Sequence, residues 1–303
     1  MPGWTPVFAQ ASDSGAKPVM RQAWLASFAR WARDNQLGLF GLVVVGGIVL
    51  CGLFGGWLAP YDPFKIQIAD RMMPPSLEHF FGTDKLGRDV LSRVLVGSNL
   101  ALQVGVLSVG ISIVMGCVLG LVAGYAPRWL DNAMLLVFDS IYSFPTVILG
   151  LALVTLFGPS TTTLIGLVIA YQTPAYARLI RTSTLGVMTS EYILAIRSIG
   201  ASPARILLVH VLPNVIGPVL IVACMDIPAI IALEASLTFL GMGVPPPSPS
   251  WGRILEEGIE SIADAPWIVV AGGAPIILAT LGFTFFGESL RDLLDPKLRG
   301  AER

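Results

Sequence analysis

The composition of the chain predicts an all-α membrane protein with six transmembrane helices. Of its 303 residues, 54% are hydrophobic and only 13% are charged, against about 25% charged residues in an average soluble domain. Apolar runs of about 20 residues, long enough to cross the hydrocarbon core as a helix, recur along the sequence. One long polar insert, at 191–214, separates two of these runs. We therefore expect a polytopic helical bundle with a structured loop outside the membrane.

We predict a tail over 1–36 and a transmembrane domain over 37–303. In the tail, Trp24, Phe28 and Trp31 recur at helical spacing among arginines, which predicts an amphipathic helix lying at the membrane interface. The tail lacks an early apolar core followed by a cleavage site, so we expect the first span to stay attached. The predicted spans are 37–59, 100–125, 133–157, 161–179, 215–240 and 267–286.

The distribution of positive charge predicts the orientation. Thirteen of the nineteen Lys and Arg residues fall on the side of the N-terminus and six on the other side. Loops rich in Lys and Arg stay in the cytoplasm. Both termini and the polar insert are therefore expected there.

The polar insert is predicted to form a helical hairpin. Gly200 permits a turn, and Ser202 followed by Pro203 has the form of an N-cap with proline at the first helical position. Pro213 marks a bend in the second helix or the start of the next element. The insert is too small to be a domain, so it is either a docking surface or an ordinary interfacial loop.

Small residues in the second predicted span indicate close helix packing. Gly116, Gly120 and Gly124 recur every four residues and share one helix face, where the backbone of another helix can approach. A pore-lining role for this face is the alternative.

Three acidic residues fall inside predicted spans, namely Asp139, Asp226 and Glu234. Ionisable groups in a membrane usually face the bundle interior or a water-filled path. These residues are therefore candidates for the translocation path. A structural role, satisfied by one another or by the backbone, is the alternative.

Two segments on the predicted outer side have distinctive sequences. Segment 79–89, HFFGTDKLGRD, combines glycine turns with Asp84, Arg88 and Asp89, which form either a local ion-pair network or a partner surface. Segment 244–252, VPPPSPSWG, is stiffened by proline ahead of Trp251 and is either a contact surface or a rigid connector.

Several kinds of site are excluded by the motifs that the sequence lacks. There is no G-x-x-x-x-G-K-[ST] phosphate loop, no H-E-x-x-H and no G-x-S-x-G, so we expect neither ATP hydrolysis nor other catalysis in this chain. A net charge of -1 argues against nucleic-acid binding. The three cysteines stand alone in apolar runs and the two histidines lie far apart, so no disulfide or metal site is predicted.

The polar insert resembles the cytoplasmic EAA loop of ABC importer permeases. The resemblance is carried by Ala195, Gly200, Leu212 and Pro213, and by the interval from Gly200 to Pro213. The chain departs from the leading Glu-Ala-Ala of that pattern, because it reads Leu-Ala-Ile at 194–196, and it has His210 where the pattern has Ile.

Four other segments are similar to the second permease of the dipeptide, oligopeptide and nickel group. They are FGTDKLGRDVLSRVLVGS at 81–98, GYAPRWLDNAMLLVFDSIYSFP at 124–145, EASLTFLGMGVPPPSPSWG at 234–252 and GESLRDLLDPKLRG at 287–300. The similarity extends over nearly all of the chain from residue 37 onward.

The resemblance implies a type I ABC importer permease in the cell inner membrane, with the polar insert as its coupling hairpin. It implies a homologous second permease, two ATPase subunits that bind ATP and Mg²⁺, and a periplasmic or lipid-anchored solute-binding protein outside. The outer residues Asp84, Arg88, Asp89 and Trp251 would contact that binding protein. The residues implied to contact the ATPases are Glu191, Ala195, Arg197, Ser198, Gly200, Ala201 and Pro213.

The function implied is ATP-driven import of di- or oligopeptides, with no cofactor held by this chain. Import of nickel or a nickel chelate is the nearest alternative, because the shared motifs concern coupling and architecture. A different class is an ion-coupled secondary transporter that uses Asp139, Asp226 and Glu234 as a relay.

Overall fold

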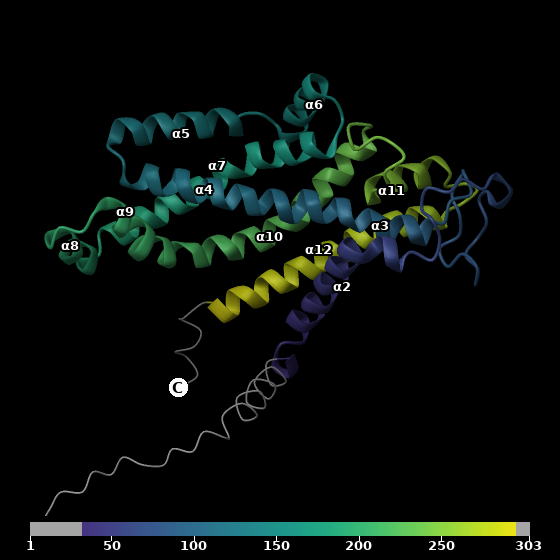
Figure 1. Ribbon diagram of the computed structural model, residues 1–303, viewed down its shortest axis with the longest axis horizontal. Coiled ribbons are helices and arrows are strands. Elements are labelled where there is room, and N and C mark those ends of the chain that lie inside the picture. Colours follow the sequence, from purple (N-terminus) through teal and green to yellow (C-terminus); the bar gives the residue numbers. More distant parts are fainter. Residues whose placement is uncertain (1–31, 295–303) are drawn as a thin grey trace, which may run out of the picture.

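The computed structural model describes residues 32–294, which form an elongated bundle of helices (Figure 1). Within these residues the only β-type pairing is an isolated bridge between Thr83 and Asp89. The all-α prediction is therefore confirmed for the described part of the chain. The predicted interfacial helix around Trp24, Phe28 and Trp31 lies outside the described residues.

The helices differ in type as well as in length. Most are α-helices, η1 is a 3-10 turn, and η2 and η3 are π-helical turns. In chain order they are α2 (Gln36–Leu58), η1 (Ile68–Asp70), α3 (Val90–Leu102), η2 (Gln103–Leu107), α4 (Ser108–Tyr125), α5 (Arg128–Tyr142), α6 (Thr146–Phe157), α7 (Thr161–Met188), α8 (Glu191–Ser198), α9 (Pro203–Arg205), η3 (Ile206–Val211), α10 (Leu212–Phe239), α11 (Trp251–Glu260) and α12 (Trp267–Leu294).

Four helical stretches of the described chain are long and apolar enough to cross a membrane, and a fifth is added if the bent pair α5 and α6 counts as one span. The predicted number of six spans is not confirmed. α2 and α12 begin within one residue of the predicted spans 37–59 and 267–286. α7 begins where the span 161–179 was predicted but continues to Met188.

Two spans are much longer than predicted because short helices join them without a break. α3, η2 and α4 run together over 36 residues from Val90, and Asp89 caps this helix by accepting the backbone N–H of Ser92 at 2.8 Å. α9, η3 and α10 run together over 37 residues from Pro203. Both helices therefore extend well beyond the apolar runs that revealed them in the sequence.

The predicted span 133–157 is divided by a sharp bend. α5 and α6 meet at an angle of 86°. The break falls between Tyr142 and Thr146, and Pro145 immediately precedes Thr146. Proline cannot donate the backbone hydrogen bond that would continue a helix, and it disfavours helical geometry in the residue before it. The bend could not be predicted from the apolar composition of 133–157, because a straight helix and a bent one have the same composition.

The three regularly spaced glycines of α4 lie buried against α7. A Cβ on Gly120 would stand 2.5 Å from the backbone oxygen of Ala177 and 2.7 Å from the Cβ of Ile180. A Cβ on Gly116 would meet Tyr176 and one on Gly124 would meet Thr184, each at 2.7 Å. The backbones of α4 and α7 are therefore close enough to exclude any side chain at these positions.

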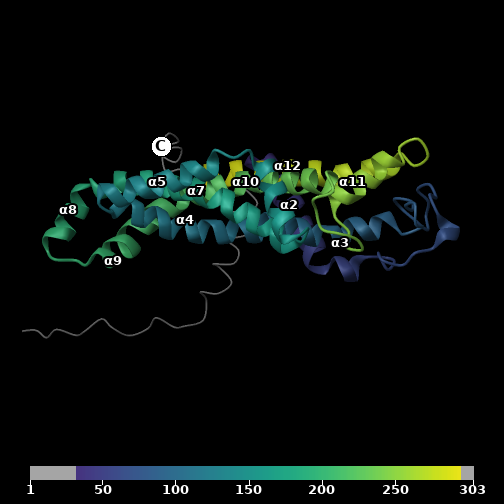
Figure 2. The same ribbon diagram turned by 90° about the horizontal axis from the view of Figure 1, so that it is seen from above.

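The two ends of the bundle carry different structures. α8 and α9 form a turn at one end, whereas the segment before α3 and the helix α11 lie at the other end (Figures 1 and 2). On α2, apolar side chains such as Val43 and Leu53 are largely exposed. Such exposure is expected of a helix that faces lipid and is unfavourable in water.

Candidate functional site

The predicted coupling hairpin, defined here as residues 191–214, forms the tip of one end of the bundle (Figure 1). α8 ends at Ser198, and Gly200 then turns the chain with φ at +85°, a conformation that favours glycine. The hydroxyl of Ser202 accepts the backbone N–H of Arg205, and Pro203 occupies the first turn of α9. The predicted helix, glycine turn and N-cap are therefore present in the structure.

The second half of the hairpin differs from a separate short helix. α9 passes through the π-helical turn η3 directly into α10, and Pro213 stands in the first turn of α10. A π-helical turn loosens the hydrogen-bond pattern just before a residue that has no N–H to donate. As a result the hairpin is continuous with a membrane-spanning helix, so a displacement of its tip can act directly on α10.

The hairpin is anchored by a few buried side chains and exposes the rest. Ile193, Ile206 and Val211 are fully buried beneath it. Most of the residues implied to contact an ATPase are exposed, and Ala201 is partly buried; the exposed ones are Glu191, Ala195, Arg197, Ser198, Gly200 and Pro213.

The exposed tip of the hairpin is markedly apolar. Ile199 is 84% exposed, and Leu194, where the EAA pattern begins with Glu, is also exposed. A partner that binds here would therefore meet apolar side chains as well as the charge of Arg197.

Four charged side chains form a buried ion-pair network at the opposite end of the bundle. Asp84 Oδ2 accepts hydrogen bonds from Arg88 Nε at 2.7 Å and from Arg93 Nη1 at 2.6 Å. Glu257, on α11, accepts from the same two arginines, at 2.5 Å from Arg93 Nη1. The network joins the start of α3 to α11, and it is the ion-pair alternative that the sequence left open.

The outer residues predicted to contact a binding protein point inward. Asp84, Arg88 and Asp89 are all buried. The carboxylate of Asp89 caps α3 and also bonds to His79 Nδ1 at 2.8 Å. Trp251 is buried too and donates from Nε1 to the backbone oxygen of Val94 at 3.0 Å. These side chains offer no surface to a partner in this structure, because they bond to α3, α11 and the segment before α3.

Asp139, Asp226 and Glu234 lie in three different environments and do not pair with one another. Asp139 is exposed on α5 and forms an ion pair with Arg178 of α7 at 3.1 Å. Glu234 is buried in α10, where the hydroxyl of Thr238 donates to it at 2.8 Å. Asp226 is partly buried and receives hydrogen bonds from Tyr176 at 2.9 Å and Gln172 at 3.1 Å.

Asp226 lines a cavity of about 370 Å³ between α5, α7 and α10, which we call the Asp226 cavity. Tyr142 and Tyr171 also line it, with their rings stacked at a centroid distance of 4.9 Å. Arg178 lies over the Tyr142 ring at 4.7 Å. The cavity therefore combines a carboxylate, two aromatic rings, the polar side chains of Gln172 and Thr146, and several apolar side chains, which is a common composition of small-molecule sites.

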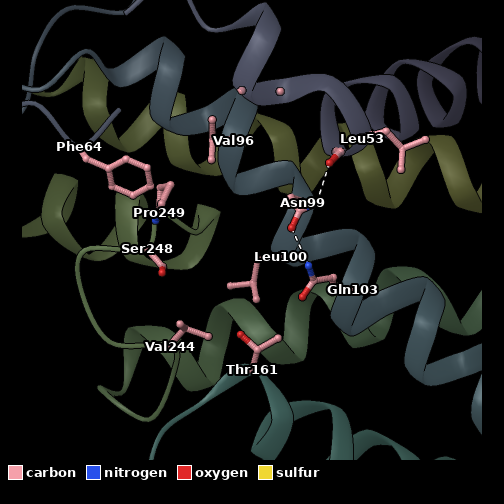
Figure 3. Close-up of a pocket in the computed structure, with 13 residues that line it drawn as sticks. Leu53, Phe64, Val96, Asn99, Leu100, Gln103, Thr161, Val244, Ser248 and Pro249 are labelled. Atoms are coloured by element: carbon pink, nitrogen blue, oxygen red, sulfur yellow. Dashed lines mark hydrogen bonds between the residues drawn. The ribbon is translucent and has the colours of Figure 1, made fainter. Parts of the chain in front are cut away.

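Figure 3 shows a second cavity, of about 360 Å³, between α2, α3 and the segment 244–249. Asn99 Nδ2 donates to the backbone oxygen of Gly52 at 2.8 Å, and Gln103 Nε2 donates to Asn99 Oδ1 at 2.7 Å. The residues that line this cavity carry no charge. The amides of Asn99 and Gln103 bond to α2 and to each other, so they help to position α2 on α3.

Several residues of these clusters were missed in the sequence. Glu257 and Arg93 complete the buried ion-pair network, and Tyr142, Tyr171 and Tyr176 surround Asp226. Gln172 and Tyr176 are spaced by four residues on α7, which was the one local signal available. The partner residues lie 50 or more positions away in the sequence, so spacing alone could not connect them.

Comparison with known proteins gives two family matches that together span most of the chain. Residues 116–300 match the family described as binding-protein-dependent transport system inner membrane component. Residues 24–75 match the N-terminal TM domain of oligopeptide transport permease C.

Individual relatives are similar over nearly their whole length. The dipeptide transport system permease protein DppC of Alkalihalophilus pseudofirmus is 35% identical, with 91% of this chain and 90% of that protein covered. The di/tripeptide transport system permease protein DppC of Pseudomonas aeruginosa is 37% identical, with 97% and 98% covered. The glutathione transport system permease protein GsiD of Escherichia coli is 39% identical, with 93% of each covered.

Proposed function

The chain belongs to the family of binding-protein-dependent transport system inner membrane components, and from this we propose that it is a permease subunit of an ATP-driven importer of di- or oligopeptides. The observation that carries the proposal is similarity over at least nine tenths of the chain to permeases named for dipeptides, di- and tripeptides, and glutathione. Glutathione is itself a small peptide. ATP and Mg²⁺ would bind in separate ATPase subunits.

The coupling hairpin is the proposed contact with one of two ATPase subunits. Its apolar tip around Ile199 and Leu194 has the composition of a protein interface, and Arg197 adds a charge beside it. Glu191, Ser198 and Ala201 complete the proposed surface. The partner would be a protein of the same importer, and a second homologous permease would present the other hairpin.

The continuity of the hairpin with α10 supports a mechanism for coupling. ATP would bring the ATPases together by binding their closed arrangement more tightly than the open one. A hairpin bound to a moving ATPase would transmit the displacement through α9 and η3 into α10, which carries Asp226 and Glu234. The translocation path would then change its access between the two sides of the membrane.

The opposite end of the bundle is the proposed docking side for a solute-binding protein. The buried network of Asp84 and Arg88 fixes the outer loops, while Leu77, which is 92% exposed, and Phe80 offer an apolar surface there. We place this end outside and both termini in the cytoplasm of a cell inner membrane, in accordance with the charge distribution of the sequence.

The proposal is tested by uptake into proteoliposomes that contain the complete complex and its binding protein. ATP enclosed on the ATPase side should drive uptake of a labelled dipeptide, and excess unlabelled dipeptide, but not Ni²⁺, should compete. A proton ionophore should leave the uptake unchanged. Uptake that persists without ATP and collapses with the proton gradient would instead establish an ion-coupled secondary transporter.

A further inference from the structure

We propose that the Asp226 cavity binds the protonated amino terminus of the transported peptide, with the Asp226 carboxylate as its ion partner. This inference rests on the proposed function, because it assumes that a peptide passes this chain. It goes further by assigning one cavity and one chemical group of the substrate to each other.

The Asp226 carboxylate has only neutral partners. Tyr176 and Gln172 both donate to its Oδ2, which leaves Oδ1 without a hydrogen bond from the described residues. Residues 32–294 place no Lys or Arg within ion-pair distance of Asp226, although other carboxylates of the chain have such partners. An unpaired charge inside a membrane span is costly. A cationic ligand would therefore gain electrostatic binding free energy from the Asp226 carboxylate that a neutral ligand would not.

Arg178 lies over the ring of Tyr142, which lines the cavity, but its guanidinium pairs with a different carboxylate. Its guanidinium forms an ion pair with Asp139 at 3.1 Å and lies over the ring of Tyr142 at 4.7 Å. Asp139 thus neutralises Arg178 on the α5 side of the cavity. This pairing leaves the negative charge of Asp226 as the unbalanced charge of the cavity.

The remaining walls suit the amino-terminal end of a peptide. The rings of Tyr142 and Tyr171 line the cavity, and aromatic rings attract ammonium groups. Val168, Ile230 and Leu233 supply an apolar surface for the first side chain. A volume of about 370 Å³ is enough for one residue and its ammonium group but not for a long peptide.

Photo-cross-linking in the reconstituted complex tests this assignment. A benzoylphenylalanine placed at Ala229, which lines the cavity, should label a radioactive dipeptide with a free amino terminus more strongly than the same dipeptide N-acetylated. In Asp226→Asn this preference should fall by about tenfold, because a charge-assisted hydrogen bond is lost. Asp226→Glu, which keeps the charge, should restore most of it.

The controls separate this inference from the proposed function. Asp264→Asn makes the same substitution at an exposed position between α11 and α12 and should leave the preference unchanged. If ATP-driven dipeptide uptake is present but the wild-type complex labels both dipeptides equally, or Asp226→Asn keeps the preference, the ammonium assignment is overturned while the importer stands. If no ATP-driven uptake occurs at all, the proposed function itself fails. Yields of the assembled variant complexes show whether a lost signal reflects misfolding.

Discussion

Individual carboxylates of this protein are stabilised in two contrasting ways. Asp84 and Glu257 are compensated by Arg88 and Arg93, whose guanidinium groups reach both carboxylates. Asp226 has only a tyrosine and a glutamine as partners. The first arrangement joins the start of α3 to α11. The second leaves the negative charge of Asp226 without a cationic partner among the described residues. Residue type and position in a span did not distinguish these cases, because the distinction depends on which partners the fold supplies.

Glu257→Ala should destabilise the purified complex by about 3–5 kcal/mol, because it leaves two buried arginines with one carboxylate between them. The loss is measured as a lower midpoint of thermal unfolding. Lys85→Ala is the matched control, since Lys85 pairs with Glu260 at 2.6 Å on the exposed surface of the same region. Breaking an exposed pair costs about 0–1 kcal/mol. Equal effects of the two substitutions would show that the buried network contributes no special stability.

At the scale of elements, proline and glycine decide where helices turn and where they continue. Gly200 and Ser202-Pro203 were sufficient to predict the hairpin, because a turn and an N-cap are local features. Pro145 breaks α5 from α6, yet Pro213 is accommodated by the π-helical turn before it. The presence of a proline therefore does not by itself tell whether a helix bends, and the bend within the predicted span 133–157 was not foreseen.

Gly200→Pro should leave the complex assembled but uncouple ATP hydrolysis from peptide uptake. Proline fixes φ near −65°, whereas Gly200 requires +85°, so the tip of the hairpin would have to rearrange. Gly200→Asn is the control at the same position, since asparagine tolerates positive φ, and it should keep most of the coupling. The ratio of peptide transported to ATP hydrolysed gives the result, and an unchanged ratio in Gly200→Pro would contradict the docking role.

On the scale of the whole molecule, the predicted coupling hairpin lies at one end of the bundle, and α11 with the segment before α3 lies at the other end (Figure 2). The two ends are joined by long helices, of which α9, η3 and α10 form one that reaches from the hairpin past Asp226 and Glu234. The proposed importer therefore has its partner surfaces on opposite sides and its candidate path between them.

Cysteine labelling should show the two ends on opposite sides of the membrane. After replacement of the native cysteines, Ser198→Cys in the hairpin should react with a membrane-impermeant maleimide only from the cytoplasmic side. Leu77→Cys, at a position that is 92% exposed in the outer segment, should react only from the other side. Labelling of both positions from one side would overturn the proposed topology.

The sequence by itself determined the helical class, the membrane-spanning runs at α2 and α12, and the hairpin with its glycine turn. These features follow from composition and from signals within a few residues of each other. The tertiary structure alone decided the bend between α5 and α6, the inward orientation of Asp84, Arg88 and Trp251, and the cavity around Asp226. Those depend on contacts between distant residues, such as Arg93 with Glu257 and Tyr176 with Asp226, which form only when the helices pack.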